Sequence, residues 1–196
     1  YYIALCALEL GNSDAESLFQ SFISVNPANN FTKLAFYQVG RSYFALKNYP
    51  KVIEWLKKLE GTGLSGKESY EYRYKLAYSH FEIKEYDQAK ALFAELKDQK
   101  SIYNEQSIYY FAYVCYLQKD YKKALIEFER LKGSGLYEDS YPYYISALYF
   151  LDNRYDDVLS YAIPILKSTK QLYETEMFRI VGASYFAKSD YTNAGT

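Results

Sequence analysis

Histidine and cysteine are scarce in this sequence. One histidine, His80, and two cysteines, Cys6 and Cys115, occur among 196 residues. A zinc site or a catalytic triad needs several ligating or proton-transferring side chains close together, and there is no second histidine to join His80. We therefore expect His80 to be a packed, hydrogen-bonded residue, and we expect no catalytic residue, no metal site and no cofactor.

The charge balance and the apolar runs argue against two further kinds of partner. Lys and Arg total 23 against 24 Asp and Glu, a net charge of −1, so no basic surplus favours nucleic acid. Charged residues or glycines interrupt every apolar stretch before it reaches the roughly 20 residues that span a bilayer. We expect no membrane insertion of this segment. Hydrophobic residues make up 49% of the chain, enough to form a core along its whole length.

A six-residue phrase recurs along the chain. It occupies 47–52, 84–89, 119–124, 153–158 and 189–194, with tyrosine in third place and alanine or valine in last place, and a weaker copy occupies 10–15. The closing residues stand 37, 37, 35, 34 and 36 residues apart. Repetition at this period predicts stacked helical hairpins. The predicted fold is therefore all-α, a right-handed α-α superhelix (solenoid). A single array is expected, with repeats at about 1–30, 31–66, 67–103, 104–138, 139–171 and 172–196, the first and last truncated.

Each repeat contains two apolar stripes at helical spacing. In repeat two the first stripe is Phe36, Val39, Gly40, Tyr43 and Phe44, and the second is Val52, Trp55, Leu56 and Leu59. The later repeats predict helices at 72–83 and 86–96, 107–117 and 121–131, 141–151 and 155–166, and 174–187. Pro164 lies inside one of them, where we expect it to kink or end the helix.

Small residues recur where the paired helices should approach most closely. They are Gly40, Ala77, Ala112, Ser146 and Gly182 on first helices, and Ala89, Ala124 and Ala194 on second helices. The two cysteines fall on first helices three repeats apart, beyond the roughly 7 Å between Cα atoms that a disulfide allows. We expect both cysteines to be buried, and we expect neighbouring carboxylates, such as Asp156 with Asp157 or Glu127 with Glu129, to lie on the solvated surface.

These residues resemble the tetratricopeptide repeat, a helix-turn-helix unit of about 34 residues. The resemblance is carried by Phe36, Val39, Gly40, Tyr43 and Val52; by Leu76, Ala77, His80, Ala89, Phe93 and Leu96; by Phe111, Ala112, Cys115, Ala124, Phe128 and Leu131; by Ile145, Ser146, Tyr149 and Val158; by Phe178, Val181, Gly182, Tyr185 and Ala194; and by Pro27, which closes repeat one. It implies a non-catalytic scaffold for protein–protein interactions. Aromatic-rich arrays of this kind are similar to bacterial envelope-assembly proteins, an analogy that points to the cell envelope or periplasm.

Tyrosine is abundant, with 26 copies, and some copies match first-helix positions that face a concave groove in the resembled family. The candidate groove residues are Tyr37, Arg41, Tyr74, Tyr78, Tyr109, Tyr113, Tyr116 and Tyr143. Rigid amphipathic rings lose little entropy on contact and so suit a binding face. Family members that grip chaperone tails carry Lys and Asn at these places. We therefore expect no carboxylate clamp, and a groove that prefers the apolar and aromatic side chains of a peptide or protein segment.

Two other functions stay open at this point. Some carbohydrate-binding lipoproteins use the same repeats, and tyrosine rings can stack on sugars, although those proteins carry long insertions and the connections here are short. The chain could also be the repeat section of a larger enzyme or regulator. Residues 61–68 nearly spell a phosphate-binding loop, but Glu68 replaces the required Ser or Thr, and the segment follows a helix. We expect it to be a linker.

Overall fold

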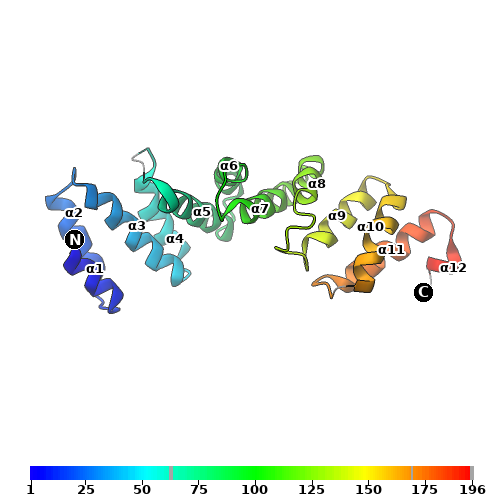
Figure 1. Ribbon diagram of the computed structural model, residues 1–196, viewed down its shortest axis with the longest axis horizontal. Coiled ribbons are helices and arrows are strands. Elements are labelled where there is room, and N and C mark those ends of the chain that lie inside the picture. The colour runs from blue at the N-terminus through cyan, green and yellow to red at the C-terminus, as the bar shows by residue number, and fades with distance from the viewer. Residues whose placement is uncertain (62–63, 169, 195–196) are drawn as a thin grey trace. The chain divides into compact units, whose positions relative to one another are not determined.

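The protein is all-α, as the sequence predicts (Figure 1). The computed structural model describes residues 1–61, 64–168 and 170–194, which contain helices and turns but no strand. The helices are α1 (Tyr2–Glu9), α2 (Ala15–Val25), α3 (Asn30–Ala45), α4 (Tyr49–Leu56), α5 (Gly66–Glu82), α6 (Tyr86–Leu96), α7 (Asn104–Leu117), α8 (Tyr121–Glu129), α9 (Tyr141–Leu151), α10 (Tyr155–Ser168), α11 (Glu174–Ala187) and α12 (Tyr191–Ala194). A 3-10 turn, Lys57–Leu59, follows α4. The largest departure from the predicted boundaries is in α5, which begins at Gly66 rather than at residue 72.

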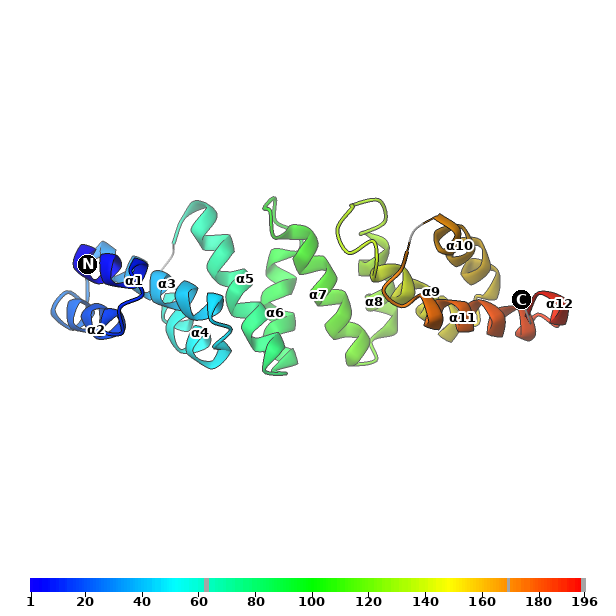
Figure 2. The same cartoon turned by 90° about the horizontal axis from the view of Figure 1, so that it is seen from below.

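Two compact bodies make up the chain, Tyr1–Ser107 and Ile108–Thr196, and each is described by itself. In the N-terminal body, α1 packs on α2, α3 on α4, and α5 on α6. The second helices α2 and α4 also pack on the next first helices, α3 and α5, and consecutive first helices touch, α1 with α3 and α3 with α5 (Figure 2). The C-terminal body follows the same scheme, with contacts α8–α9, α9–α10, α10–α11, α11–α12 and α9–α11. Packing of hairpins against their sequence neighbours is the defining property of a helical solenoid.

The recurring phrase folds into the same turn each time. Its first residue has a left-handed backbone, with φ between 56° and 64° at Lys47, Lys84, Lys119, Asn153 and Ser189. That residue donates its amide to the carbonyl three residues back at 2.9–3.0 Å, and the next residue donates to the carbonyl five residues back at 2.8–2.9 Å. These two bonds form a Schellman motif, which satisfies the last carbonyls of a helix. The phrase therefore specifies the bend of each hairpin.

The small residues lie at close helix contacts. A Cβ atom added to Gly40 would lie 2.3 Å from Cδ2 of Leu56, so α3 and α4 meet with no room for a side chain there. Ala77, Ala112 and Ser146, at the equivalent positions, are fully buried. The sequence-based assignment of these contacts is confirmed at Gly40.

Large apolar side chains fill the interior of each body. Trp55, 1% exposed, packs with Phe19, Ala35 and Val39 in the N-terminal body. A second cluster in that body contains Val52, Leu56, Leu59, Leu76, Tyr37 and Tyr72. In the C-terminal body the largest fully buried side chains include Phe128, Leu131, Ile145 and Met177.

Several local expectations were wrong. Cys6 is exposed, as are Ile3 and Leu10 close to it in the sequence, whereas Cys115 is buried as expected. Glu127 is 8% exposed and pairs with Arg130 at 2.6 Å, so it is not a solvated carboxylate. Of the expectation that Pro164 kinks or ends its helix, the second half is wrong, since α10 continues to Ser168. Part of the expected linker at 61–68, residues 62–63, lies outside the described residues.

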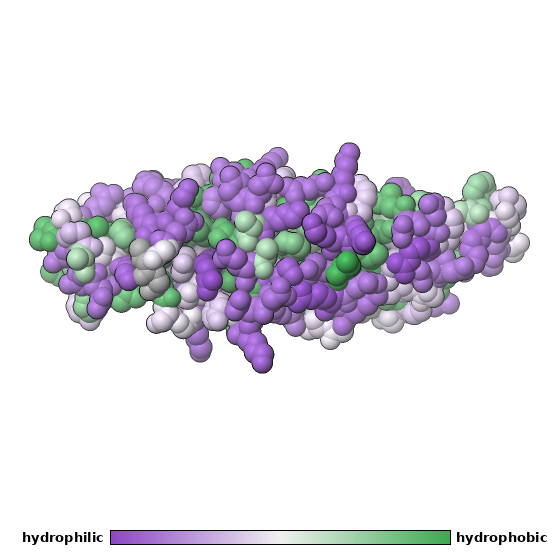
Figure 3. All heavy atoms as spheres, turned by 90° about the horizontal axis from the view of Figure 1, so that it is seen from above, coloured by the Kyte–Doolittle hydropathy of each residue, from purple (hydrophilic) through white to green (hydrophobic). Residues whose placement is uncertain are grey.

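Hydrophilic side chains predominate on the face shown in Figure 3, with small hydrophobic patches between them. In the part of the chain that the structure describes, no helix combines the length and the hydrophobicity needed to cross a bilayer.

Candidate interaction surface

The predicted groove residues of the N-terminal body come from two neighbouring first helices. Tyr37, Arg41 and Phe44 follow one another at helical spacing on α3, and Tyr74, Tyr78 and Phe81 occupy the same places on α5. Because α3 and α5 pack together, the two rows lie on adjacent helices. We call the exposed part of Arg41, Tyr74 and Tyr78 with Tyr103 the N-terminal tyrosine face.

Ring contacts hold this face in place. The Tyr78 ring lies 5.7 Å from Phe44, 6.0 Å from Tyr49 and 6.2 Å from Tyr74, measured between centroids. Tyr74 stacks on Tyr103 at 4.8 Å with an interplanar angle of 22°. Tyr74, Tyr78 and Tyr103 are each partly buried. Each ring is therefore fixed on one side and keeps some surface for a partner.

Glu71 is the charged centre beneath this face. Arg41 Nε and Lys75 Nζ each lie 3.5 Å from Glu71 Oε1, and the Tyr37 hydroxyl hydrogen-bonds to the same carboxylate. Burial raises the pKa of Tyr37, and the hydrogen bond to Glu71 adds to that rise. Burial also lowers the pKa of Lys75, whose ammonium lies 4.2 Å from the centre of the Phe44 ring.

In the C-terminal body the tyrosines form a denser cluster, and its centre is Tyr144. The Tyr144 ring lies 5.3 Å from both Tyr113 and Tyr116 and stacks on Phe128 at 5.0 Å. Its hydroxyl donates to that of Tyr173 at 3.4 Å. Burial, with that hydrogen bond second, raises the pKa of Tyr144. Tyr144 was missed in the sequence because it falls one residue after the predicted groove position, Tyr143.

A repeated ring contact was also missed. An aromatic residue just before or at the start of a first helix packs against an aromatic residue in or next to the preceding first helix, stacked in two pairs and tilted in two. The pairs are Tyr1 with Phe31 at 4.9 Å, Tyr74 with Tyr103 at 4.8 Å, Tyr109 with Tyr137 at 4.0 Å and Tyr143 with Tyr173 at 4.8 Å. The partners stand 28 to 30 residues apart in the sequence, so a search for aromatic pairs at that spacing could have found them.

Two of the eight predicted groove residues have little surface to offer. Tyr37 is 4% exposed and Tyr109 is 9% exposed. Burial raises the pKa of Tyr109 to about 12. Tyr74, Tyr78, Tyr113, Tyr116 and Tyr143 are partly exposed, and Arg41 is exposed. Tyr37 and Tyr109 therefore support their neighbours rather than present a surface.

His80, the one histidine of the sequence, is buried. Its Nδ1 lies 2.6 Å from Glu85 Oε2, as expected for a packed histidine.

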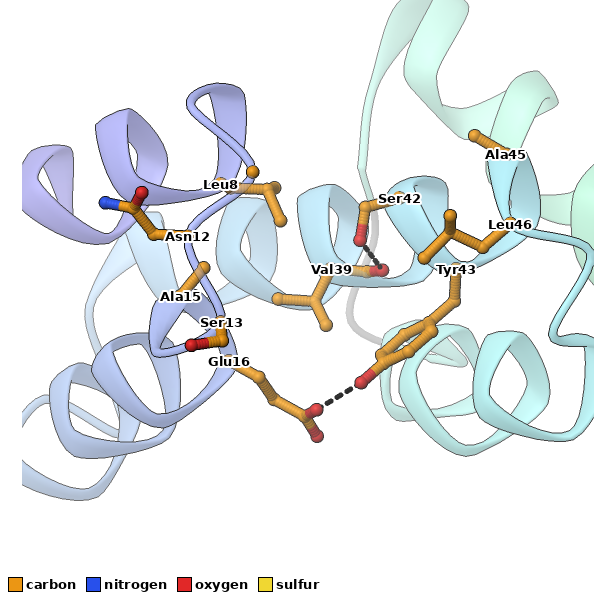
Figure 4. Close-up of a pocket in the computed structure, with 11 residues that line it drawn as sticks. Leu8, Asn12, Ser13, Ala15, Glu16, Val39, Ser42, Tyr43, Ala45 and Leu46 are labelled. Atoms are coloured by element: carbon orange, nitrogen blue, oxygen red, sulfur yellow. Dashed lines mark hydrogen bonds between the residues drawn. The ribbon is translucent and has the colours of Figure 1, made fainter.

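The structure also contains a cleft that the sequence did not predict. This cleft, of about 410 Å³, opens between the α1–α2 turn and α3. There Tyr43 donates a hydrogen bond to Glu16, which joins α3 to α2 (Figure 4). Among the described residues no group of three or more His, Cys, Asp and Glu could hold a metal ion.

Hairpins packed on their neighbours, with aromatic rows on the first helices, define an α-helical repeat protein. Residues 71–99, the hairpin of α5 and α6, match the sequence profile of the family described as Tetratricopeptide repeat. This hairpin therefore carries the tetratricopeptide repeat that the recurring phrase of the sequence predicts. Proteins built from this repeat typically serve as scaffolds for protein partners.

A comparison with solved structures agrees with the helical-repeat fold. The solved structure MamA MSR-1 C2 matches with a TM-score of 0.66, covering 84% of this chain and 91% of that chain. The sequence identity is 11%, so this similarity shows the fold alone. No curated protein matches the sequence.

Proposed function

We propose that the chain is a non-catalytic scaffold that binds a peptide or protein segment on the aromatic surfaces of its first helices. In the N-terminal body this surface is the N-terminal tyrosine face. In the C-terminal body it comprises the exposed parts of Tyr113, Tyr116 and Tyr143.

The observation that carries the proposal is the fixed yet partly exposed state of Tyr74 and Tyr78. Each ring contacts several other rings and each remains partly accessible. A ring already held in its bound orientation loses little conformational entropy when a partner covers it. Tyrosine also offers both an apolar ring and a hydroxyl, a combination enriched among the residues that dominate binding energy.

The test begins with peptides selected for binding. Random peptides displayed on phage are selected on the full chain, and the strongest are resynthesised with a fluorophore for anisotropy titrations. Tyr78→Ala should weaken binding by about tenfold or more, as for a central aromatic contact. Tyr78→Phe, which keeps the ring, should retain most of the affinity.

Tyr191→Ala is the matched control. Tyr191 is a 63% exposed tyrosine at the start of α12, a second helix, and its removal should leave the affinity unchanged. Far-UV circular dichroism checks that each variant is folded. Equal affinity of wild type and Tyr78→Ala would contradict the proposal for this face, and failure of the wild type to select any peptide would contradict it altogether.

A further inference from the structure

Arg41 is the one charged group of the N-terminal tyrosine face that points unused donors to solvent. Its side chain is 55% exposed, whereas those of Glu71 and Lys75 are 22% and 17% exposed. Among the described residues the guanidinium makes a single ion pair, through Nε to Glu71 at 3.5 Å. The two terminal nitrogens of its planar fork are left for a ligand.

Glu71 does not cancel this positive charge. Its carboxylate is shared by Arg41, Lys75 and the Tyr37 hydroxyl, so one negative charge faces two cations. Lys75 is mostly covered and lies over Phe44. Of the two cations on Glu71, Arg41 is therefore the one that presents its charge to solvent. The ligand group that complements a guanidinium fork is a carboxylate.

Stacked rings lie beside this guanidinium. Tyr103, stacked on Tyr74, is close enough to Glu71 and Arg41 for both charges to act on its hydroxyl. We infer that the N-terminal tyrosine face binds an acidic side chain inside an extended partner segment, with the carboxylate on Arg41 and an adjacent aromatic or proline side chain on the Tyr74–Tyr103 stack. This inference rests on the proposed function and names the chemistry of its partner.

The surroundings of Arg41 favour an internal acidic residue over a chain terminus. A terminal carboxylate brings its own backbone groups, which need polar partners close by. Apart from Glu71, the surface beside Arg41 includes the Tyr103 ring, with Tyr74 stacked on it. An aspartate or glutamate side chain can reach the guanidinium while its flanking residues cover those rings.

The experiment compares peptide selections on the full chain and its variants. Random 12-residue peptides are displayed in two formats, one joined to phage at both ends and one with a free carboxyl terminus. The variants are Arg41→Gln and Arg41→Glu, with Glu68→Gln as the control. Glu68 is an exposed carboxylate in the first turn of α5 and acts on the nearby Tyr37 hydroxyl. Arg41 is exposed, so its replacement should not disturb the fold.

The wild type should select peptides enriched in Asp or Glu beside Phe, Tyr, Trp or Pro, in both formats. Arg41→Glu should lose the acidic enrichment, and Glu68→Gln should keep it. A resynthesised peptide with its Glu changed to Gln should bind the wild type about five- to tenfold more weakly, because a charge-assisted hydrogen bond is lost. The same Glu-to-Gln change in the peptide should have little effect on its affinity for the Arg41→Gln variant.

Three outcomes would overturn the inference, and they are distinguishable. Aromatic peptides without acidic enrichment would refute the role of Arg41 while the proposed function stands. Acidic enrichment found only among peptides with a free carboxyl terminus would show that Arg41 binds a chain end and not an internal acidic side chain. Selection of no peptide by the wild type would refute both the inference and the proposed function.

Discussion

The contact of Gly40 with Leu56 allows a worked prediction of stability. In Gly40→Ala the added Cβ would lie 2.3 Å from Leu56 Cδ2 and 2.6 Å from Leu56 Cγ. Leu56 is fully buried and packed among Val52, Leu59 and Leu76, so it cannot move aside freely. Overpacking of this kind costs about 1–3 kcal/mol, and this contact belongs at the upper end. Alanine gains about 1 kcal/mol over glycine in a helix interior. The net loss of unfolding free energy should be about 2 kcal/mol.

The single tryptophan makes the assay specific. Trp55 is buried in the N-terminal body, next to Leu56, so its fluorescence during urea unfolding reports on that body. Leu56→Ala alone should cost about 2–5 kcal/mol. The double variant should cost about 1–3 kcal/mol less than the sum of the two single changes, because the shortened side chain makes room for the new methyl group.

Gly182→Ala is the comparison, since among residues 1–61, 64–168 and 170–194 its Cβ would meet only the Ala194 carbonyl oxygen, at 3.3 Å. It should leave the Trp55 transition almost unmoved. A Gly40→Ala protein as stable as the wild type, or strictly additive changes at positions 40 and 56, would refute the assigned helix contact.

Three further predictions follow from burial and hydrogen bonding. Cys6 should react with maleimide in the native protein while Cys115 reacts only after unfolding, as mass spectrometry of the labelled peptides would show; equal labelling would contradict the burial pattern. Buried tyrosines such as Tyr109 have a raised pKa in the folded state. Their contribution to stability is therefore complete below the unfolded pKa of about 10 and is lost as pH rises toward 12. In an alkaline titration, tyrosinate absorbance of the folded protein should rise at higher pH than that of the unfolded chain. Identical titration curves for the folded and unfolded chains would argue against burial. Tyr43→Phe should lower the unfolding free energy by about 1 kcal/mol, because it removes the bond to Glu16 between α3 and α2, and an unchanged urea midpoint would show that bond to be unimportant.

The period of the sequence predicts the helices and their pairing well. Repetition at 34 to 37 residues identifies the hairpins, and the small residue at Gly40 identifies a close contact that the structure contains. These features are local, since they depend on helical spacing and on the space available between paired helices.

The accessibility of individual tyrosines could not be predicted in the same way. Tyr37 and Tyr74 occupy equivalent places, yet Tyr37 is buried with its hydroxyl on Glu71, whereas Tyr74 stays partly exposed beside Tyr103. The difference depends on which side chains arrive from other helices, which helical spacing does not encode. Cys6 illustrates the same limit, because it is exposed although its position on a first helix predicted burial.

The identical Schellman turns make the length of the protein editable. Residues 48–84 run from just after one left-handed residue, Lys47, to the next, Lys84, and therefore contain one complete period with its own reversal of chain direction. A second copy of that segment inserted after Lys84 would enter and leave through the same backbone geometry, but the copied Leu56 would then face Ala77 in place of Gly40. Evolution or a protein engineer could thus lengthen the molecule by whole periods without inventing a new connection.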